Sequence, residues 1–495
     1  MFSTSDTIVA IATPPGRGGL GVVRFSGPEA HRIARCLITR DGALHPRHAT
    51  LTKIRLMPDP TDERLKPDLT VEGLKPDLAS ENMKPDTACD DNSYVASGFS
   101  RTNTASHAIE QVVATYFPAP ASYTGDDVVE LSAHGSPVVL RAIVAAAIAA
   151  GARLAEPGEF TLRAFVNGRI DLMQAEAVAD LIDAVTPLQA RVAFDQLQGT
   201  LTRTIGVIDA ALFDLIARLE ASVDFPDEGY HFIDPGALAT AVDALIERTR
   251  SLLVDAQRGR LVREGLQIAI VGKPNVGKSS LFNALVGTAR AIVTDRPGTT
   301  RDLVTEVVDL DGLRVTLIDT AGLRETSDRI EAEGVERARQ AQDVSDLILV
   351  VLDGATPLDA LDYQLIMQDD DSKSLIVSNK SDLDPAWSRP DAVRVSARTL
   401  CGISELRQAI VTALDVEPLR DRPEITNVRH IALVRRAHDA LLRARAAVAG
   451  DNGSLSEEFV LADLQEARAA FEETVGRRAD DEVLTHIFSR FCIGK

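Results

Sequence analysis

Two motifs in the middle of the chain have the residue types and spacing that bind phosphate and a divalent metal ion. Gly272-Lys-Pro-Asn-Val-Gly-Lys-Ser279 is typical of a phosphate-binding loop, in which glycines let backbone N–H groups turn toward a phosphate. Lys278 is expected to reach the β- and γ-phosphates, and the Ser279 hydroxyl is expected to ligate magnesium. Asp319-Thr-Ala-Gly322 is expected to hold that magnesium through water and to present the Gly322 N–H to the γ-phosphate.

Two further motifs indicate the base. In Asn379-Lys-Ser-Asp382 the Asp382 carboxylate can accept the N1 and N2 protons of guanine, which adenine does not offer. Ser396-Ala-Arg398 is expected to bring a backbone N–H to the guanine carbonyl. These motifs together predict a GTP-hydrolysing domain. The predicted GTP-binding residues are Gly272, Asn275, Val276, Gly277, Lys278, Ser279, Ser280, Thr294, Asp295, Arg296, Pro297, Gly298, Thr299, Thr300, Asp319, Thr320, Ala321, Gly322, Asn379, Lys380, Ser381, Asp382, Ser396, Ala397 and Arg398.

The residue that orients the attacking water differs from that of small GTPases. Leu323 follows Asp-Thr-Ala-Gly at the position where those proteins carry a glutamine, and leucine cannot polarise water. Glu325, two residues further on, is the candidate catalytic residue, acting directly or through a second water. The alternative is that Glu325 is only a solvated loop carboxylate.

A monovalent cation is predicted beside the phosphates. The Asn275 side-chain oxygen lies in the phosphate-binding loop and can ligate such a cation, which would place positive charge where other systems insert an arginine. The loop after Asp319–Gly322 and the segment Thr294–Asp302 are the two expected switch segments, which respond to the γ-phosphate. Its backbone carbonyls can enclose the cation, and Thr300 is the preferred candidate for completing the magnesium coordination.

The motifs lie within a pattern of apolar strands that alternate with helices, which is typical of a parallel, doubly wound sheet. Helical periodicity precedes and follows this pattern. Ile208, Leu212, Leu215 and Leu219 share one face of a helix that should stop near Pro226, and Leu484, Ile487, Phe488 and Phe491 have helical spacing. The α/β domain is therefore predicted to be inserted between two helical segments that can pack together. The predicted strands are Ile268–Val271, Val315–Ile318, Leu347–Leu352, Leu375–Val377 and Val393–Val395.

Composition narrows the class of protein. A chain of 495 residues exceeds one hydrophobic core, and its charge of -20 argues against a broadly basic, nucleic-acid-binding surface. If RNA is a substrate, a partner is expected to supply much of the binding surface. The four cysteines have neither disulfide nor zinc spacing, residues 1–13 lack the features of a signal peptide, and Val138–Ala150 is too short to span a bilayer. These features predict a cytoplasmic protein without a membrane partner.

The first 117 residues mix short β-rich runs with Gly/Pro turns, which predicts a small α+β domain. Within it, Leu65-Lys-Pro-Asp, Leu74-Lys-Pro-Asp and Met83-Lys-Pro-Asp repeat with a period of nine residues. This acidic, proline-rich stretch is interpreted as a low-complexity surface insertion at about 58–105; a binding element is the alternative.

The whole chain resembles the MnmE family, also called TrmE, of tRNA-modifying GTPases. A resemblance to GTPase domains in general would account only for the motifs in the middle third of the chain. The resemblance rests on motifs in every part of the chain, namely Asp6–Gly21, Ser122–Asp127, Pro157–Thr161, Arg163–Leu172, Thr299–Asp302, Asp319–Glu325 and Phe491–Lys495.

The resemblance implies a multidomain fold of the α/β plus α+β class. A P-loop GTPase domain with a mostly parallel, doubly wound sheet would be inserted in an all-helical domain, after a small α+β domain of the folate-binding type. The predicted boundaries are 1–160 for the α+β domain, 161–264 and 421–495 for the two helical parts, and 265–420 for the GTPase domain.

The resemblance also implies an activity and partners. Family members install an aminomethyl or carboxymethylaminomethyl group on C5 of the wobble uridine, position 34, of certain tRNAs. They use GTP hydrolysis, Mg²⁺, K⁺ and a one-carbon unit of tetrahydrofolate, as the 5-formyl or 5,10-methylene form. They act as a homodimer that joins an MnmG-type, FAD-containing partner in a heterotetramer or larger complex.

The family's site residues can be assigned to the positions of this chain that match the family's motifs. Arg24, Glu130, Arg169 and Lys495 would contact the folate, and Arg169 stands where many relatives have lysine, which changes the geometry of the charge. The chain departs from the family pattern in two segments, the Lys-Pro-Asp insertion and Ser132–Ser136. Both bear on the local geometry of the N-terminal domain and leave the GTPase domain unchanged.

The metal and catalytic residues are carried over in the same way. Potassium would be surrounded by Asn275, Thr294, Arg296 and Thr299, and magnesium would be held by Ser279 and Thr300. Glu325 would act in GTP hydrolysis.

Cys492 has two interpretations that the sequence leaves open. A thiolate with a lowered pKa could attack C6 of uridine, or the side chain could simply pack beside Ile487 and Phe491.

The alternative function is a ribosome-assembly GTPase that acts as a binding checkpoint. Such a protein is expected to carry a basic RNA-binding module beside its GTPase domain, whereas this chain carries an α+β domain and a terminal Cys-Ile-Gly-Lys. A third hypothesis, a folate-dependent methyltransferase, leaves the GTPase motifs unexplained.

Overall fold

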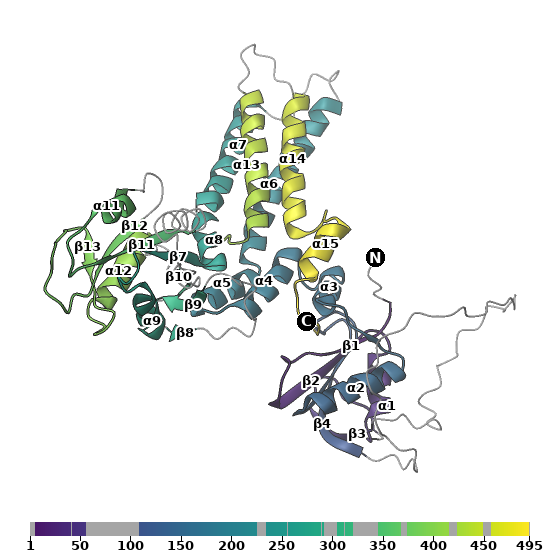
Figure 1. Ribbon diagram of the computed structural model, residues 1–495. Helices are drawn as coiled ribbons and strands as arrows, with labels where there is room; N and C mark the ends of the chain where they lie inside the picture. The colour runs from purple at the N-terminus through teal and green to yellow at the C-terminus, as the bar shows by residue number, and fades with distance from the viewer. Residues whose placement is uncertain are drawn as a thin grey trace, which may run out of the picture. The chain divides into compact units, whose positions relative to one another are not determined.

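The computed structural model describes residues 5–40, 42–55, 108–224, 234–254, 256–288, 290–291, 304–310, 312–319, 345–367, 374–414, 423–448 and 457–494 (Figure 1). The chain forms two compact units. Met1–Ile170 and Asp480–Lys495 make up the N-terminal unit, and Asp171–Ala479 makes up the second. The predicted insertion at about 58–105 falls outside the described residues.

A six-stranded sheet forms the frame of the N-terminal unit. Its strand order is β3-β4-β5-β2-β1-β6, with β1 parallel to β6 and the other neighbours antiparallel. The predicted α+β character of this region is confirmed. The strands are β1 (Ile8–Ile11), β2 (Gly18–Ser26), β3 (Thr50–Arg55), β4 (Ala108–Phe117), β5 (Val128–Gly135) and β6 (Arg153–Leu154).

Helices cover both faces of this sheet. Side chains alternate along β1, so its residues contribute to the core on each face. Val9 joins a core with helices α1 (Ala30–Leu37) and α2 (Pro137–Ala149), whereas Ile8 and Ala10 pack with Phe160 of α3 (Glu159–Val166). The apolar segment Val138–Ala150 corresponds to α2, whose Leu140 and Ile143 are buried in this core while Val138 and Ile148 are exposed.

The C-terminal segment returns to the N-terminal unit. Helix α15 (Asp481–Phe488) packs its Phe488 ring 6.4 Å from that of Phe165, and Ile493 forms an antiparallel bridge with Pro157. The spacing predicts a helix through Phe491; that prediction is wrong, because the helix ends at Phe488, the next residues form a turn in which the Phe491 N–H donates to the Phe488 carbonyl, and Ile493 then forms the bridge. Residues 480–495 also group apart from the helical domain in which 421–495 was expected.

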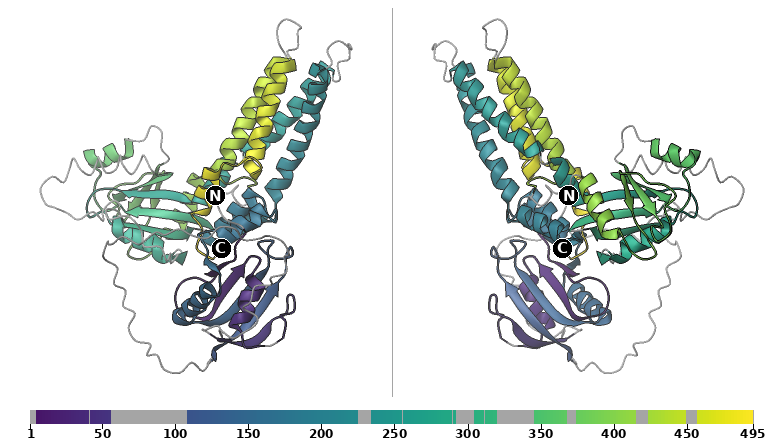
Figure 2. Two further views of the ribbon diagram at one scale, coloured as in Figure 1. Left: turned by 90° about the vertical axis from the view of Figure 1, so that its right-hand side faces the viewer. Right: turned by 90° about the vertical axis from the view of Figure 1, so that its left-hand side faces the viewer.

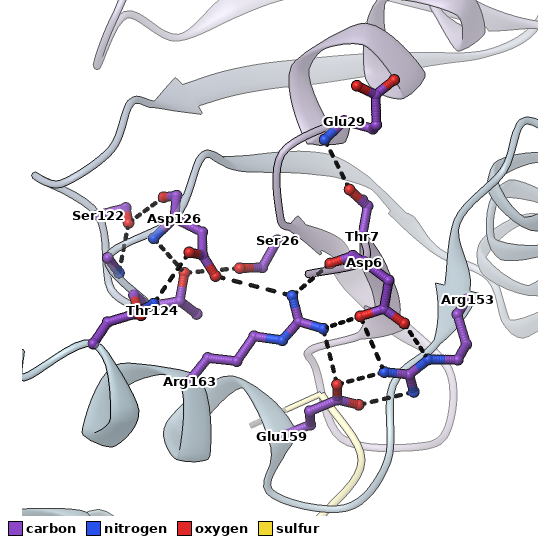
Figure 3. Close-up of polar contacts among 12 residues, drawn as sticks. Asp6, Thr7, Ser26, Glu29, Ser122, Thr124, Asp126, Arg153, Glu159 and Arg163 are labelled. Atoms are coloured by element: carbon purple, nitrogen blue, oxygen red, sulfur yellow. Dashed lines mark hydrogen bonds and ion pairs between the residues drawn. The ribbon is translucent and has the colours of Figure 1, made fainter. Parts of the chain in front are cut away.

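A buried arginine holds helix α3 to the strands (Figure 3). Arg163 is fully buried, and its Nη2 donates to Asp6 Oδ1 at 2.6 Å and to Glu159 Oε1 at 3.0 Å. Its Nη1 donates to the Asp6 carbonyl at 2.7 Å. Arg153 of β6 reaches the same two carboxylates, so α3, β1 and β6 share one ionic network.

The network lowers the pKa of its carboxyl groups. Burial alone would raise the pKa of Glu159, but hydrogen bonds from Arg153, the Glu156 N–H and Arg163 outweigh it. The pKa of Asp6 is lowered in the same manner by both arginines, against the effect of burial. Both groups therefore stabilise the fold above their unfolded-state pKa values, and this stabilisation is lost as the pH falls through the folded-state values.

A helical bundle forms part of the second unit. Its core joins residues from both sides of the inserted domain, such as Leu212 and Leu245 with Leu441 and Phe471, as predicted for one helical domain (Figure 1). Among the described residues, no helix is both long and apolar enough to cross a membrane. The helices of this domain are α4 (Leu172–Asp183), α5 (Pro187–Leu197), α6 (Thr200–Asp224), α7 (Pro235–Val254), α8 (Ala256–Glu264), α13 (Val428–Val448) and α14 (Glu457–Val475).

The inserted domain contains a seven-stranded sheet of order β13-β12-β11-β7-β10-β9-β8. Figure 2 shows the strands of this domain, in teal and green, between its helices. Neighbouring strands from β13 to β10 are parallel, while β9 and β8 continue the sheet antiparallel. The mostly parallel sheet is confirmed, but the antiparallel edge was not predicted. The strands are β7 (Leu266–Val271), β8 (Arg290–Ala291), β9 (Val304–Leu310), β10 (Leu313–Asp319), β11 (Leu347–Asp353), β12 (Ser374–Asn379) and β13 (Ala392–Arg394).

Both faces of this sheet are buried, which explains why its strands read as continuous apolar runs. On one face Ile268 and Ile270 pack with α9 (Lys278–Thr288) and α12 (Ile403–Ala413). On the other, Ala269 and Val271 pack with α11 (Ala360–Met367).

Polar contacts hold α8, the helix from which the chain enters the inserted domain, against the other helices of the bundle. Arg263 at the end of α8 pairs with Asp180 of α4 at 2.8 Å, and the Gln189 amide donates to the Val262 carbonyl at 3.0 Å. Gly259 is required nearby, because a Cβ there would collide with the Ile425 carbonyl of the returning chain.

We predict that replacing Arg163 by Met lowers the stability of the full chain by about 3 kcal/mol, because the buried Glu159 and the partly exposed Asp6 each lose one of their two arginine partners. The variant should also lose less stability than the wild type when the pH falls below about 4, where those carboxyls protonate. Thermal and urea unfolding at several pH values measure both effects. Arg218→Met, which removes an exposed pair with Asp214, is the control and should change stability by under about 0.5 kcal/mol. Equal effects of the two substitutions would contradict the assignment.

Candidate nucleotide-binding site

Four strands of the inserted domain end at the same edge of the sheet. Val271 pairs with Val350, Asp353 pairs with Asn379, and Asp319 pairs with Ile270, so strands β7, β10, β11 and β12 end side by side. In parallel sheets this carboxyl edge is where ligands bind. The phosphate-loop and base-loop motifs, which are about a hundred residues apart in sequence, therefore meet.

The phosphate-binding loop connects β7 to α9, as predicted. Asn275 has a φ of 64°, a left-handed conformation that asparagine tolerates better than most residues. Gly277 has a φ of 97°, and a Cβ there would collide with the Asn379 amide. The loop thus turns its backbone toward the first turn of α9, whose unpaired N–H groups attract anions.

Lys278 begins α9 and lies across the loop. Its side chain is largely buried, and its Nζ donates to the Lys273 carbonyl at 2.8 Å. The ammonium is therefore held over the loop, where a phosphate would meet it. Asn275, Ser279 and Ser280 are exposed beside it, and a serine hydroxyl and an amide oxygen are suitable ligands for Mg²⁺ and K⁺ respectively. These two positions fit the metal ions that the sequence predicts.

The buried side chain of Asn379 joins three motifs. Its Nδ2 donates to the Val276 carbonyl of the phosphate loop at 2.8 Å, and its Oδ1 accepts the Ala397 N–H at 3.1 Å. Only 3% of Asn379 is exposed. Because both ends of the amide are used, the phosphate loop, the base loop and the Ser396–Arg398 loop are held in one arrangement.

Asp382 is held in place by Ser396. The Ser396 hydroxyl donates to Asp382 Oδ1 at 2.6 Å, and its oxygen accepts the Thr399 N–H at 3.2 Å. This hydrogen bond is the main cause that lowers the pKa of Asp382. The carboxylate is exposed and stays ionised, so both of its oxygens can accept hydrogen bonds from the N–H groups of a base.

The other predicted residues of this site are only partly described. Thr294–Thr300, Thr320–Gly322, Leu323 and Glu325 lie outside the described residues, and only the backbone of Asp319 is described. Val276 is buried, and Lys380, Ser381, Ala397 and Arg398 lie in the loops described above.

A second polar cluster lies in the N-terminal unit around Arg24. Arg24 of β2 pairs with Glu130 directly opposite on β5, with Nε 2.9 Å from Oε1. Its guanidinium also stands 5.8 Å from the ring centre of Tyr123 and 5.7 Å from that of Phe160. A partly exposed cation between a carboxylate and two aromatic faces suits a ligand that has both a flat ring system and carboxylates, as a folate does.

The remaining predicted folate residues lie around the same loop and the C-terminal segment. Arg169 is exposed and its Cγ would lie 3.3 Å from a Cβ at Gly125, two residues after Tyr123. Arg24 Nη1 donates to the Gly494 carbonyl at 3.5 Å, so the C-terminal segment reaches this cluster. Lys495 lies outside the described residues.

Cys492 belongs to that segment and is exposed. Ile487 and Phe491 are buried, so the thiol does not share their packing. Exposure is what the nucleophile interpretation requires.

The sequence did not single out several residues that support these sites. Lys273 lies inside the phosphate loop and pairs with Asp362, Asp353 pairs with Lys380 of the base loop and accepts the Trp387 indole N–H, and Tyr123 and Phe160 flank Arg24. Tyr123 and Phe160 lie inside motifs singled out in the sequence, but no local signal points to Asp353 or Trp387.

Comparisons with known families cover nearly the whole chain. A family model described as the MnmE helical domain matches residues 172–492. A second, described as the GTP-binding protein TrmE N-terminus, matches residues 7–71 and 75–169.

Curated relatives match over their full length. The chain is 42% identical over 501 residues to the tRNA modification GTPase MnmE of Koribacter versatilis, covering all of both chains. It is 38% identical over 505 residues to the protein of that name from Nitrosospira multiformis, again covering all of both chains. Among solved structures, it is 27% identical to a variant of Era from Aquifex aeolicus bound to GDP·AlF4⁻, with a TM-score of 0.24, covering 36% of this chain and 67% of that one.

We predict that Asp382→Asn weakens GTP binding by at least about a hundredfold and lets xanthosine triphosphate bind instead, because the amide can donate to the 2-oxo group of xanthine. Equilibrium titration of the full chain with both nucleotides measures the exchange. Asp384→Asn, an exposed neighbour in the same loop, is the matched control and should bind GTP as the wild type does. Unchanged GTP binding by Asp382→Asn would show that this carboxylate does not read the base.

Proposed function

This chain belongs to the MnmE family of tRNA modification GTPases, and from that membership we propose that it hydrolyses GTP at the carboxyl edge of β7, β10, β11 and β12 to drive tRNA modification. The observation that carries the proposal is the Asn379 amide, which ties the phosphate loop to the base loop at hydrogen-bonding distance. A site that reads guanine and cradles phosphates in one arrangement is what GTP hydrolysis needs.

The chain's own residues divide the work of hydrolysis. The phosphate-loop N–H groups and Lys278 would hold the β- and γ-phosphates, and Asp382 would hold the base edge. Ser279 and Thr300 would hold Mg²⁺, which neutralises charge on the phosphate oxygens when it is bound. Glu325 would orient the attacking water, since Leu323 offers no polar group.

A potassium ion would take the place of an arginine supplied by another protein. Asn275, whose left-handed backbone turns the loop at its exposed edge, would provide a side-chain oxygen. Thr294, Arg296 and Thr299 would complete the shell from the switch. Oxygen ligands of this kind select a hard cation, which stabilises the charge that develops on the phosphates.

The Arg24 cluster is proposed as the folate site. Arg24, Glu130, Arg169 and Lys495 would bind a 5-formyl- or 5,10-methylene-tetrahydrofolate, whose ring could lie against Tyr123 and Phe160. The folate supplies the one-carbon unit when it is bound. Arg24 also touches the segment that carries Cys492, which would place an accessible thiol near that chemistry.

The substrate and partners are proposed from the family. The chain would act as a homodimer with an MnmG-type, FAD-containing partner in the cytoplasm. Together they would add an aminomethyl or carboxymethylaminomethyl group to C5 of the wobble uridine. The charge of -20 is consistent with a partner that supplies much of the tRNA-binding surface.

The ribosome-assembly alternative has no observation in its favour. Its expected basic module would flank the GTPase domain, but the flanks here match the TrmE N-terminus and the MnmE helical domain.

We predict that the GTPase rate rises when K⁺ replaces Na⁺ at constant ionic strength, because K⁺ is the cation that Asn275 is proposed to hold beside the phosphates. Phosphate release by the full chain measures it, and Asn275→Ala should remove the difference between the salts. Equal rates of the wild type in both salts would contradict the cation assignment.

We predict that a strain lacking this gene loses the C5 modification of wobble uridine, measured by mass spectrometry of tRNA nucleosides. The wild-type gene should restore it, whereas Glu325→Ala should not, although that variant still binds GTP. Full modification in the deletion strain would exclude the tRNA assignment, and restoration by Glu325→Ala would show that hydrolysis through this residue is not needed.

A further inference from the structure

The segment Asp353–Asp362, here called the β11–α11 segment, runs between the two nucleotide loops. It follows β11, the strand that lies between β7 and β12 in the sheet. The phosphate loop follows β7 and the base loop follows β12. A segment in this place can contact both loops, and its three aspartates do so.

On the phosphate side, two of these aspartates hold Lys273. The Lys273 Nζ lies 2.6 Å from Asp359 Oδ2 and 2.8 Å from Asp362 Oδ2. The Asp359 carboxylate is 58% exposed, whereas Asp362 is only 5% exposed, so the contact with Asp362 is the one shielded from solvent. Desolvation would lower the pKa of Lys273, but hydrogen bonds to both carboxylates raise it, so the ammonium stays charged.

The carboxylates are themselves fixed by the start of α11. Asp359 Oδ1 accepts the N–H groups of Leu361 at 3.0 Å and Asp362 at 3.1 Å, and Asp362 Oδ2 accepts the Asp359 N–H at 3.1 Å. This reciprocal capping leaves little freedom to either side chain. Lys273 is therefore held by a rigid anchor.

Lys273 also contacts Lys278, the lysine expected to bind the phosphates. Its backbone carbonyl accepts the hydrogen bond from Lys278 Nζ at 2.8 Å. The anchor on the Lys273 side chain thus fixes the carbonyl that holds the Lys278 ammonium over the loop.

On the base side, Asp353 holds Lys380. Lys380 has a φ of 66°, which is unfavourable for lysine, and its Nζ donates to Asp353 Oδ2 at 2.6 Å. The other carboxylate oxygen accepts the Ala355 N–H at 2.9 Å, and the Asp353 carbonyl accepts the indole N–H of Trp387 at 2.8 Å. Asp353 is thereby fixed before any ligand binds.

The backbone contact next to Asp353 is equally close. The Gly354 N–H donates to the Asn379 carbonyl at 2.8 Å, and a Cβ on Gly354 would lie 2.7 Å from Ser378 Oγ. Only glycine allows this approach. The base loop is therefore held to the β11–α11 segment by both a side chain and the backbone.

We propose that the β11–α11 segment is a positioning element for GTP, which sets the phosphate loop through Lys273 and the base loop through Lys380. This rests on the proposed nucleotide site. Lys273, Asp353, Asp359 and Asp362 are positioning residues, since they act through Lys278 and Lys380. The two clamps fix the distance between the phosphate and base subsites before the nucleotide arrives, so less order must be imposed on binding.

Double-mutant cycles on the full chain test the proposal, with GTP affinity measured by calorimetry in Mg²⁺ and K⁺. Lys273→Gln and Asp362→Asn should each raise the Kd by about five- to tenfold, and the double variant by no more than one of them, because either change breaks the same clamp. Lys380→Gln and Asp353→Asn should behave in the same way. Lys273→Arg keeps the pair and should keep the affinity within about twofold.

The matched control is Asp391→Asn, which breaks an exposed pair with Arg389 elsewhere in the same domain, 2.7 Å between Nη2 and Oδ2. It should leave the Kd unchanged. A merely structural role for the clamps predicts lower melting temperatures with wild-type GTP affinity, or losses that add in the double variants, and either result overturns the proposal. Should Asp362→Asn fail to fold, the contrast between Lys273→Gln and Lys273→Arg decides, and equal affinities would overturn it.

Failure of the nucleotide site itself would look different. A wild-type chain that does not bind GTP would refute the site. Wild-type binding with unaffected clamp variants would refute the positioning element alone.

Discussion

The buried amide of Asn379 is the contact on which the nucleotide site depends. It lies where β12 ends, and it uses its donor on the phosphate loop and its acceptor on the Ser396–Arg398 loop. Leaving either partner unsatisfied in a 3% exposed position would cost about 1–3 kcal/mol, which makes any other arrangement of the three loops unfavourable. The phosphate loop, the base loop and the Ser396–Arg398 loop are held together by this one side chain.

The parallel sheet explains why such a contact is possible. Strands β7, β11 and β12 are in register at their carboxyl ends, and both faces of the sheet are buried by helices, so the strand ends cannot drift. The loops then need only short polar contacts to be fixed. In the N-terminal unit Arg163 has a comparable part, because it joins β1 and α3 beside the strands that carry Arg24 and Glu130.

Residues whose chemistry depends on local spacing were predictable from the sequence. The phosphate loop between β7 and α9, Asp382 in the base loop and the mostly parallel sheet all follow from short motifs and strand periodicity. Contacts between distant positions were not predictable in this way. Asp353 with Lys380 and Arg24 with Gly494 depend on how strands are ordered and where the chain returns, which no local pattern encodes. The end of α15 at Phe488 was misjudged for the same reason, since Ile493 continues as a bridge to Pro157 instead of a helical turn.

The central claim is that one preformed site in the inserted domain reads guanine and holds phosphates. Calorimetric titration of the full chain with GTP and with ATP, in Mg²⁺ and K⁺, tests it most directly. We predict one GTP per chain and ATP affinity weaker by at least about a hundredfold, because Asp382 would face an adenine edge that lacks both the N1 and the N2 protons of guanine. Equal affinity for the two nucleotides, or more than one GTP per chain, would contradict it.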